Sequence, residues 1–156
     1  ETLAEKPAFR VLLSTHRCLV PASGFFEWKK EGKKKIPYYI RLSGSPLFSF
    51  AGLYDQWRNP EGVTVSTYTI VTCDANHLVA PLHDRMPVIL SPQGEDRWLD
   101  TCPIPYGEVN KILVPYPAGL MEAIPVSDRV NSPAVDDERL IQPLVSQSGT
   151  QRLLEE

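Results

Sequence analysis

Short apolar runs, separated by turn signals, dominate the pattern of hydrophobic and polar positions along this chain. Runs that are rich in β-branched and aromatic residues and bounded by Gly, Pro, Ser and Asn are typical of β-strands. The run at 65–73 is especially rich in such residues. The pattern as a whole predicts strands over residues 17–21, 24–28, 37–42, 47–53, 65–73, 86–90 and 122–126.

Helices are expected to be few and short, because 15 prolines and 9 glycines interrupt the sequence. Asp74 is a candidate N-cap for a helix over 75–79. Ser91 followed by Pro92 resembles a cap with proline at the first helical position, leading into a helix through 95–99. A further helix is expected over 108–114. Strands with helices between some of them predict an α+β fold, with a mixed, mostly antiparallel, barrel-like sheet and short helices.

The chain has 156 residues, of which 42% are hydrophobic and 22% are charged. This composition excludes a fully disordered or collagen-like chain and fits one globular domain. No apolar stretch is long enough to predict a membrane-spanning helix, and no signal peptide opens the sequence. Because the sequence begins with Glu1 and not with methionine, we interpret this end as different from the native start of the gene product. The polar segment 146–156 is expected to be a flexible C-terminal tail.

The net charge of −3 gives no global basic field that would indicate a nucleic-acid partner. A local basic cluster leaves two interpretations open, a solvated hairpin loop or a patch that binds phosphate. The 3 cysteines do not resemble the framework of a secreted disulfide-rich protein, so a reducing cytoplasmic setting is expected. The basic cluster consists of Lys29, Lys30, Lys33, Lys34, Lys35 and Arg41.

Cys73, His77 and His83 lie close together in the sequence and are residue types that bind metal ions. Their spacing, Cys-x3-His-x5-His, has no second cysteine pair and no obvious fourth ligand, whereas zinc sites normally have three or four closely spaced ligands. We therefore predict no metal site. Cys18 and Cys73 lie in apolar strand runs, where cysteine behaves as a small hydrophobic residue.

Glu27 is a candidate catalytic residue because of its apolar surroundings in the sequence Phe25-Phe26-Glu27-Trp28. Alternation along a strand places Phe25 and Glu27 on one face. A carboxylate inside an apolar pocket has a raised pKa and suits general acid–base catalysis. The simpler interpretation is a carboxylate at the surface beside an aromatic residue.

His83 is the second candidate, because Asp84 and Arg85 follow it directly. Histidine can accept or donate a proton near neutral pH, and the planar guanidinium of an arginine can hold a phosphate or a carboxylate. A lone histidine is more often structural, so both interpretations stay open from this pattern.

Four ordered motifs resemble those of the SOS-response-associated peptidase (SRAP) family. Its central motif is similar to residues 17–28, RCLVPASGFFEW, and its next two are similar to YTIVT at 68–72 and HDRMP at 83–87. The closing Val-Ser-x-x-Val-Asn is present at 126–131. The resemblance implies an SRAP domain over residues 1–145 that lacks its N-terminal portion.

The resemblance implies a function that composition alone does not indicate. Members of the family recognise abasic sites in single-stranded DNA and become covalently linked to them through a cysteine that follows the initiator methionine. The protein removes that methionine itself, and the amine and thiol of the cysteine then form a thiazolidine with the sugar aldehyde. The resemblance further implies no metal or organic cofactor, no membrane partner, a monomer when intact, and a cytoplasmic, nucleoid-associated location in a prokaryote.

The family's functional residues carry over onto four positions. Glu27 matches the catalytic glutamate, which is expected to assist proton transfer at the amine and the release of the methionine. His83 matches the catalytic histidine, which is expected to protonate the sugar oxygen as the ring opens. Thr72 and Arg85 match residues that bind DNA, Thr72 in the lesion pocket and Arg85 on a phosphate. Packing is the preferred interpretation for Trp28.

The sequence departs from the family pattern at its beginning. Glu1 and Thr2 resemble the end of the family's Asn-Ala-Arg-x-Glu-Thr motif, and the N-terminal cysteine is absent from this sequence. A thiazolidine needs an α-amine and a thiol on one residue, so the hypothesis is that this chain alone does not form the crosslink. The main alternative is a non-enzymatic β-rich module that binds single-stranded nucleic acid, and another is a hydrolase that uses the Glu–His pair.

Overall fold

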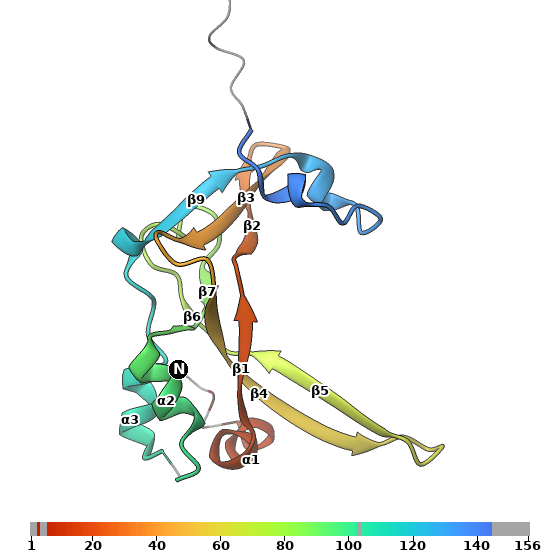
Figure 1. The fold of residues 1–156 in the computed structure, drawn as a ribbon, viewed down its shortest axis with the longest axis vertical. Coiled ribbons are helices and arrows are strands. Elements are labelled where there is room, and N and C mark those ends of the chain that lie inside the picture. The colour runs from red at the N-terminus through yellow and green to blue at the C-terminus, as the bar shows by residue number, and fades with distance from the viewer. Residues whose placement is uncertain (1–2, 4–5, 103, 145–156) are drawn as a thin grey trace, which may run out of the picture.

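The computed structural model of the chain describes residues 3, 6–102 and 104–144. Figure 1 shows the three α-helices gathered at one end of the molecule. The predicted flexible tail at 146–156 lies outside the described residues. None of the helices in the described ranges has the length and apolar character that crossing a membrane would require.

The strands form three antiparallel sheets. The largest has the order β1–β4–β5, with β8 also paired to β4, the second has the order β2–β3–β9, and the third consists of β6 and β7. The predicted α+β class and mostly antiparallel pairing are confirmed, and the described strands form no closed barrel. The strands are β1 Arg17–Ala22, β2 Phe25–Glu31, β3 Lys34–Leu42, β4 Phe48–Arg58, β5 Thr64–Ile70, β6 Thr72–Asp74, β7 Arg85–Pro87, β8 Ile89–Leu90 and β9 Met121–Pro125.

Two of the predicted helices are present, the first beginning at Pro92 after its cap as the sequence indicated, and the second beginning at Tyr106, two residues earlier than expected. Ser91 caps the first of them, since its hydroxyl oxygen accepts a hydrogen bond from the backbone N–H of Gly94. A further helix at the start of the chain was not predicted, although a proline stands at its first position. The side chain of Leu13, on its apolar face, is buried in the core. The helices are α1 Pro7–Thr15, α2 Pro92–Leu99 and α3 Tyr106–Ile112, with short 3₁₀ turns η1 Ala118–Leu120, η2 Asp128–Asn131 and η3 Glu138–Ile141.

The predicted helix over 75–79 is wrong, because the chain forms consecutive turns there. The side chain of Asn76 accepts hydrogen bonds from the backbone N–H groups of Leu78 and Val79, both at 3.0 Å. Such local bonds between side chain and backbone compete with the regular bonds of a helix. The turns that result carry the chain around to His83.

Two of the predicted strands are divided, one at Val71 and the other at Val88. Both valines form backbone hydrogen bonds with Ala51 in β4. The Val71 N–H donates to the Ala51 carbonyl, and the Ala51 N–H donates to the Val88 carbonyl. The Val88 N–H also donates to the Val71 carbonyl, at 2.9 Å. The chain therefore changes from the sheet of β4 to the β6–β7 hairpin at these residues, which separates β5 from β6 and β7 from β8.

The core lies where the first half of β4 meets β1, β8 and α2. From Phe48 to Leu53 every residue of β4 is buried, on both faces of the strand. Helix α2 covers this region with Trp98, which has no exposed surface and whose indole N–H donates to the carbonyls of Cys18 and Gly52. The two carbonyls belong to residues that face each other in the β1–β4 pairing, so one side chain joins the helix to both strands.

Candidate functional site

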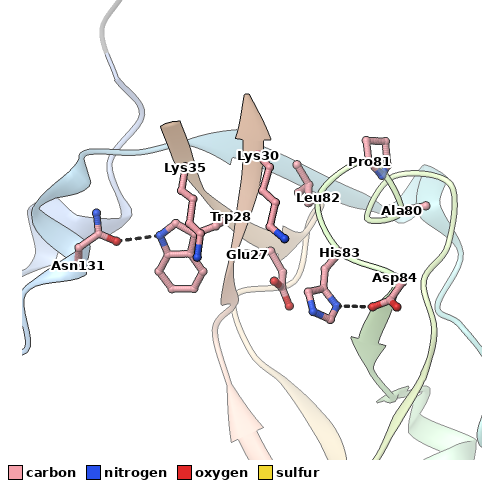
Figure 2. Close-up of a pocket in the computed structure, with 10 residues that line it drawn as sticks. All are labelled: Glu27, Trp28, Lys30, Lys35, Ala80, Pro81, Leu82, His83, Asp84 and Asn131. Atoms are coloured by element: carbon pink, nitrogen blue, oxygen red, sulfur yellow. Dashed lines mark hydrogen bonds and ion pairs between the residues drawn. The ribbon is translucent and has the colours of Figure 1, made fainter. Parts of the chain in front are cut away.

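A cavity of about 940 Å³ lies between the β2–β3 hairpin and the loop that precedes β7. Figure 2 shows the side chains of Glu27 and His83 pointing toward each other from these two elements. The sequence predicted these two residues as the catalytic pair, and the structure brings them to one cavity. Its lining consists of Glu27, Trp28, Lys30, Lys35, Ala80, Pro81, Leu82, His83, Asp84 and Asn131.

Glu27 is half-buried in β2, opposite Tyr38 of β3. Burial raises the pKa of its carboxyl above the ordinary value of 4.5, since desolvation disfavours the charged form. The nearby charge of His83 and a backbone hydrogen bond at Trp28 lower this pKa, and Asp84 raises it. A carboxyl with a raised pKa beside an imidazole can exchange protons with a substrate nearer to neutral pH than an exposed carboxyl can.

The glycine before this strand is required by close packing. A Cβ atom on Gly24 would lie 2.4 Å from the ring of Tyr39 and 2.6 Å from the carbonyl oxygen of Ile40. Both contacts belong to β3, so any other residue here would push β2 away from its partner strand and move Glu27. The glycine of the GFFEW motif therefore fixes the position of the carboxylate.

His83 has hydrogen-bonding partners at Nδ1 in both protonation states. The backbone N–H of Arg85 lies 3.0 Å from Nδ1 and donates to it when the ring is neutral with its proton on Nε2. When the ring is protonated, Nδ1–H has two acceptors, the Asp84 carboxylate at 3.1 Å and the Arg85 carbonyl at 3.2 Å. Because Nδ1 is directed at the backbone, Nε2 is the nitrogen that remains for a substrate.

Asn76 holds the loop that carries His83. Its side-chain NH₂ donates to the Tyr116 carbonyl at 2.7 Å, while its side-chain oxygen accepts from Leu78 and Val79. A backbone hydrogen bond also joins the two ends of the loop, since the Ala75 N–H donates to the Asp84 carbonyl at 3.0 Å. One side chain therefore connects the turns before His83 to a segment forty residues further along the chain.

Replacing Asn76 with alanine is expected to lower the free energy of unfolding by about 2 kcal/mol, because it leaves partly buried backbone groups without their partner. It is also expected to shift and broaden the NMR signals of the His83 ring. The matched control is Asn59→Ala, since Asn59 makes a similar turn bond to Val63 at 2.8 Å in the exposed β4–β5 hairpin. Unchanged His83 signals in Asn76→Ala would contradict this positioning role.

Thr72 and Arg85, the two predicted DNA-binding residues, lie together on the β6–β7 hairpin but line a second cavity, of about 200 Å³, with Lys6 and Phe9. The Arg85 guanidinium donates to the Asp74 carboxylate at 2.7 Å and to the Thr72 carbonyl at 2.8 Å. The structure thus pairs Glu27 with His83 and Thr72 with Arg85, in two cavities. Arg85 lies two residues after His83 in the sequence but lines the second cavity.

Asn131 and the two cavity lysines were not identified as site residues from the sequence. Asn131 accepts a hydrogen bond from the indole N–H of Trp28 at 2.8 Å, which joins the closing Val-Ser-x-x-Val-Asn motif to the GFFEW motif. The occurrence of both motifs in one chain was the signal that could have indicated this contact. Lys30 and Lys35 were recognised only as part of a basic cluster, because their side-by-side arrangement depends on the register of the hairpin.

Cys18 and Cys73 do not supply an activated thiol. Cys73 is buried, as predicted, and burial raises the pKa of its thiol to about 11. Burial likewise raises the pKa of the half-buried Cys18 thiol. Within residues 3, 6–102 and 104–144, no group of three or more His, Cys, Asp or Glu side chains is arranged to hold a metal ion.

Comparison with known proteins agrees with the motifs that form this site. The sequence pattern of the family described as SOS response associated peptidase (SRAP) matches residues 1–133, and the chain belongs to this family. It is 47% identical over 143 residues to the abasic site processing protein YoqW of Bacillus subtilis, a match that covers 91% of this chain and 64% of that protein. It is 33% identical over 165 residues to the abasic site processing protein HMCES of Gallus gallus, with 92% of this chain and 48% of that protein covered.

The fold is similar to a crystal structure of a protein from Bacteroides thetaiotaomicron, with a TM-score of 0.86 and 35% sequence identity. That similarity covers 92% of this chain and 63% of the other protein. The chain therefore spans less than two thirds of the length of these relatives.

Proposed function

We propose that the gene product containing this chain processes abasic sites in single-stranded DNA, and that residues 1–145 are part of its SRAP domain. The observation that carries the proposal is the Glu27 carboxyl and the His83 imidazole facing each other across one cavity. Two further findings support it, the family match and relatives whose names state that they process abasic sites. A cytoplasmic, nucleoid-associated location agrees with a DNA substrate and stays a prediction.

The proposed reaction uses an N-terminal cysteine outside this sequence. Its α-amine adds to C1 of the ring-opened sugar and expels water to form an imine, after a proton reaches the ring oxygen. The thiol then adds to the imine carbon while the nitrogen takes up a proton, so the product is a thiazolidine and one water is lost. In this scheme His83 supplies the proton to the ring oxygen, and Glu27 moves protons at the amine and assists the release of the initiator methionine.

The test is a crosslinking assay with the protein expressed from its complete gene. Single-stranded DNA with one natural abasic site is expected to give a heat-stable adduct on a denaturing gel. The same strand with a tetrahydrofuran analogue, which has no aldehyde, is expected to give none. The 156-residue chain alone is also expected to give none. An adduct from this chain alone, or none from a complete gene product, would contradict the proposed chemistry, and binding without an adduct would favour a binding module.

A further inference from the structure

Two lysines lie directly opposite each other near the tip of the β2–β3 hairpin. The register pairs Lys30 of β2 with Lys35 of β3, so both side chains emerge on the same face of the sheet. Like charges at directly opposite positions of an antiparallel pair repel each other and destabilise the pairing. The Lys30–Lys35 pair therefore does not contribute to the stability of the hairpin.

Lys29 and Lys34, unlike this pair, each lie beside Glu31. Lys29 forms an ion pair with Glu31 at 2.7 Å, and Glu31 also lies opposite Lys34 in the register. In the described ranges of the chain, neither Lys30 nor Lys35 forms an ion pair. The ammonium groups of two residues at directly opposite positions are thus left to attract an anion from outside the protein.

The lysine pair belongs to the lining of the Glu27–His83 cavity. Lys30 lies two residues after Trp28 on the same strand face, and in Figure 2 both lysine side chains extend from the hairpin toward Trp28 and Glu27. The opposite side of the cavity carries the Asp84 carboxylate, beside His83. The cavity therefore has a cationic side at the hairpin and an anionic group at the loop, which favours one placement of a negatively charged chain.

We propose that Lys30 and Lys35 together form a binding site for a backbone phosphodiester of single-stranded DNA, next to the abasic nucleotide in the cavity. This inference rests on the proposed function, and it adds a phosphate contact separate from the one predicted for Arg85. A phosphate between the two ammonium groups replaces their mutual repulsion with two attractions. The carboxylate of Asp84 disfavours a phosphate at the other side, so the pair also sets which side of the cavity the backbone follows.

The test compares two double variants that remove the same charge from the same hairpin. Lys30→Gln with Lys35→Gln removes the cavity pair, and Lys33→Gln with Lys34→Gln is the matched control, because neither Lys33 nor Lys34 lines the cavity. Binding of single-stranded DNA carrying the unreactive tetrahydrofuran analogue is measured by fluorescence anisotropy over a range of salt concentrations. All proteins are expressed from the complete gene.

The cavity variant is expected to bind about 20-fold more weakly than wild type at about 0.1 M salt, because each contact with single-stranded DNA adds roughly 0.7 to the salt slope. Its plot of log K against log salt is expected to be shallower by about 1.4. Its melting temperature is expected to rise by roughly 1–3 °C, because a repulsive cross-strand pair has been removed. The control is expected to retain wild-type affinity within about threefold, with no rise in melting temperature.

Equal weakening and equal salt slopes in the two double variants would overturn the inference while wild-type binding keeps the proposed function intact. A wild-type protein that does not bind single-stranded DNA would overturn the proposed function and the inference together. The double variants therefore test the lysine site, and the wild-type protein tests the proposed function.

Discussion

Glutamine at position 27 is expected to slow the crosslinking of abasic DNA by about 100- to 10,000-fold, the usual contribution of a general acid–base group. Glutamine has nearly the shape of glutamate, so it leaves the cavity and the β2–β3 pairing in place, but it cannot take up or release a proton. The rate is measured in single turnover on denaturing gels with the complete gene product. Glu31→Gln is the matched control, because Glu31 lies on the same strand, is exposed, and does not line the cavity.

The same substitution is expected to increase stability at neutral pH. Burial raises the pKa of Glu27 in the folded protein above 4.5, so the folded state holds this proton more tightly than the unfolded state does. The contribution of Glu27 to stability is therefore full below about 4.5 and is lost as the pH rises through the raised pKa. Glu27→Gln should exceed wild type in melting temperature at neutral pH, and the difference should shrink in acid.

Two outcomes would contradict this account of Glu27. A wild-type crosslinking rate in Glu27→Gln would show that the carboxyl takes no part in the reaction. A loss of rate together with a loss of stability at neutral pH would mean that the carboxylate serves the fold.

The strands could be predicted from the sequence because their pattern is local. The points at which the chain passes from one sheet to another could not be predicted. Val71 continues the β-branched run on either side of it, so nothing in the local sequence indicates a break there. At Val88 the only local signal of a break is the preceding Pro87. The division comes from hydrogen bonds to Ala51, which is twenty or more residues away in the chain. The turns after Asn76 escaped prediction for a related reason, since a helical cap and a closed turn use the same residue types.

The proposed catalytic pair was predicted from motifs, but the shape of the site depends on contacts between distant segments. Glu27 and His83 are recognisable in their own motifs, while the pairing of Lys30 with Lys35 requires the register of the hairpin. The separation of Arg85 from the first cavity could not be predicted either. Arg85 lies only two residues from His83 in the sequence, yet it points along the β6–β7 hairpin to Asp74.

Alanine at position 98 is expected to lower the free energy of unfolding by about 3–5 kcal/mol, the largest effect on stability that we predict. Trp98 has no exposed surface, so its removal leaves a cavity beneath α2 that the surrounding strands fill only in part. The carbonyls of Cys18 and Gly52 also lose their shared donor. Urea unfolding followed by far-UV circular dichroism measures the change.

Two further variants keep this prediction testable even where Trp98→Ala does not fold. Trp98→Phe retains most of the buried ring and loses the indole N–H, so a smaller cost of about 1–2 kcal/mol is expected, mostly from the two carbonyls. Leu99→Ala changes the next residue of α2, which is 49% exposed, and is expected to cost less than about 1 kcal/mol. Equal stability of Trp98→Phe and wild type would show that the indole hydrogen bonds contribute nothing. A cost in Leu99→Ala as large as that of Trp98→Phe would mean that α2 as a whole, and not its buried indole, joins β1 to β4.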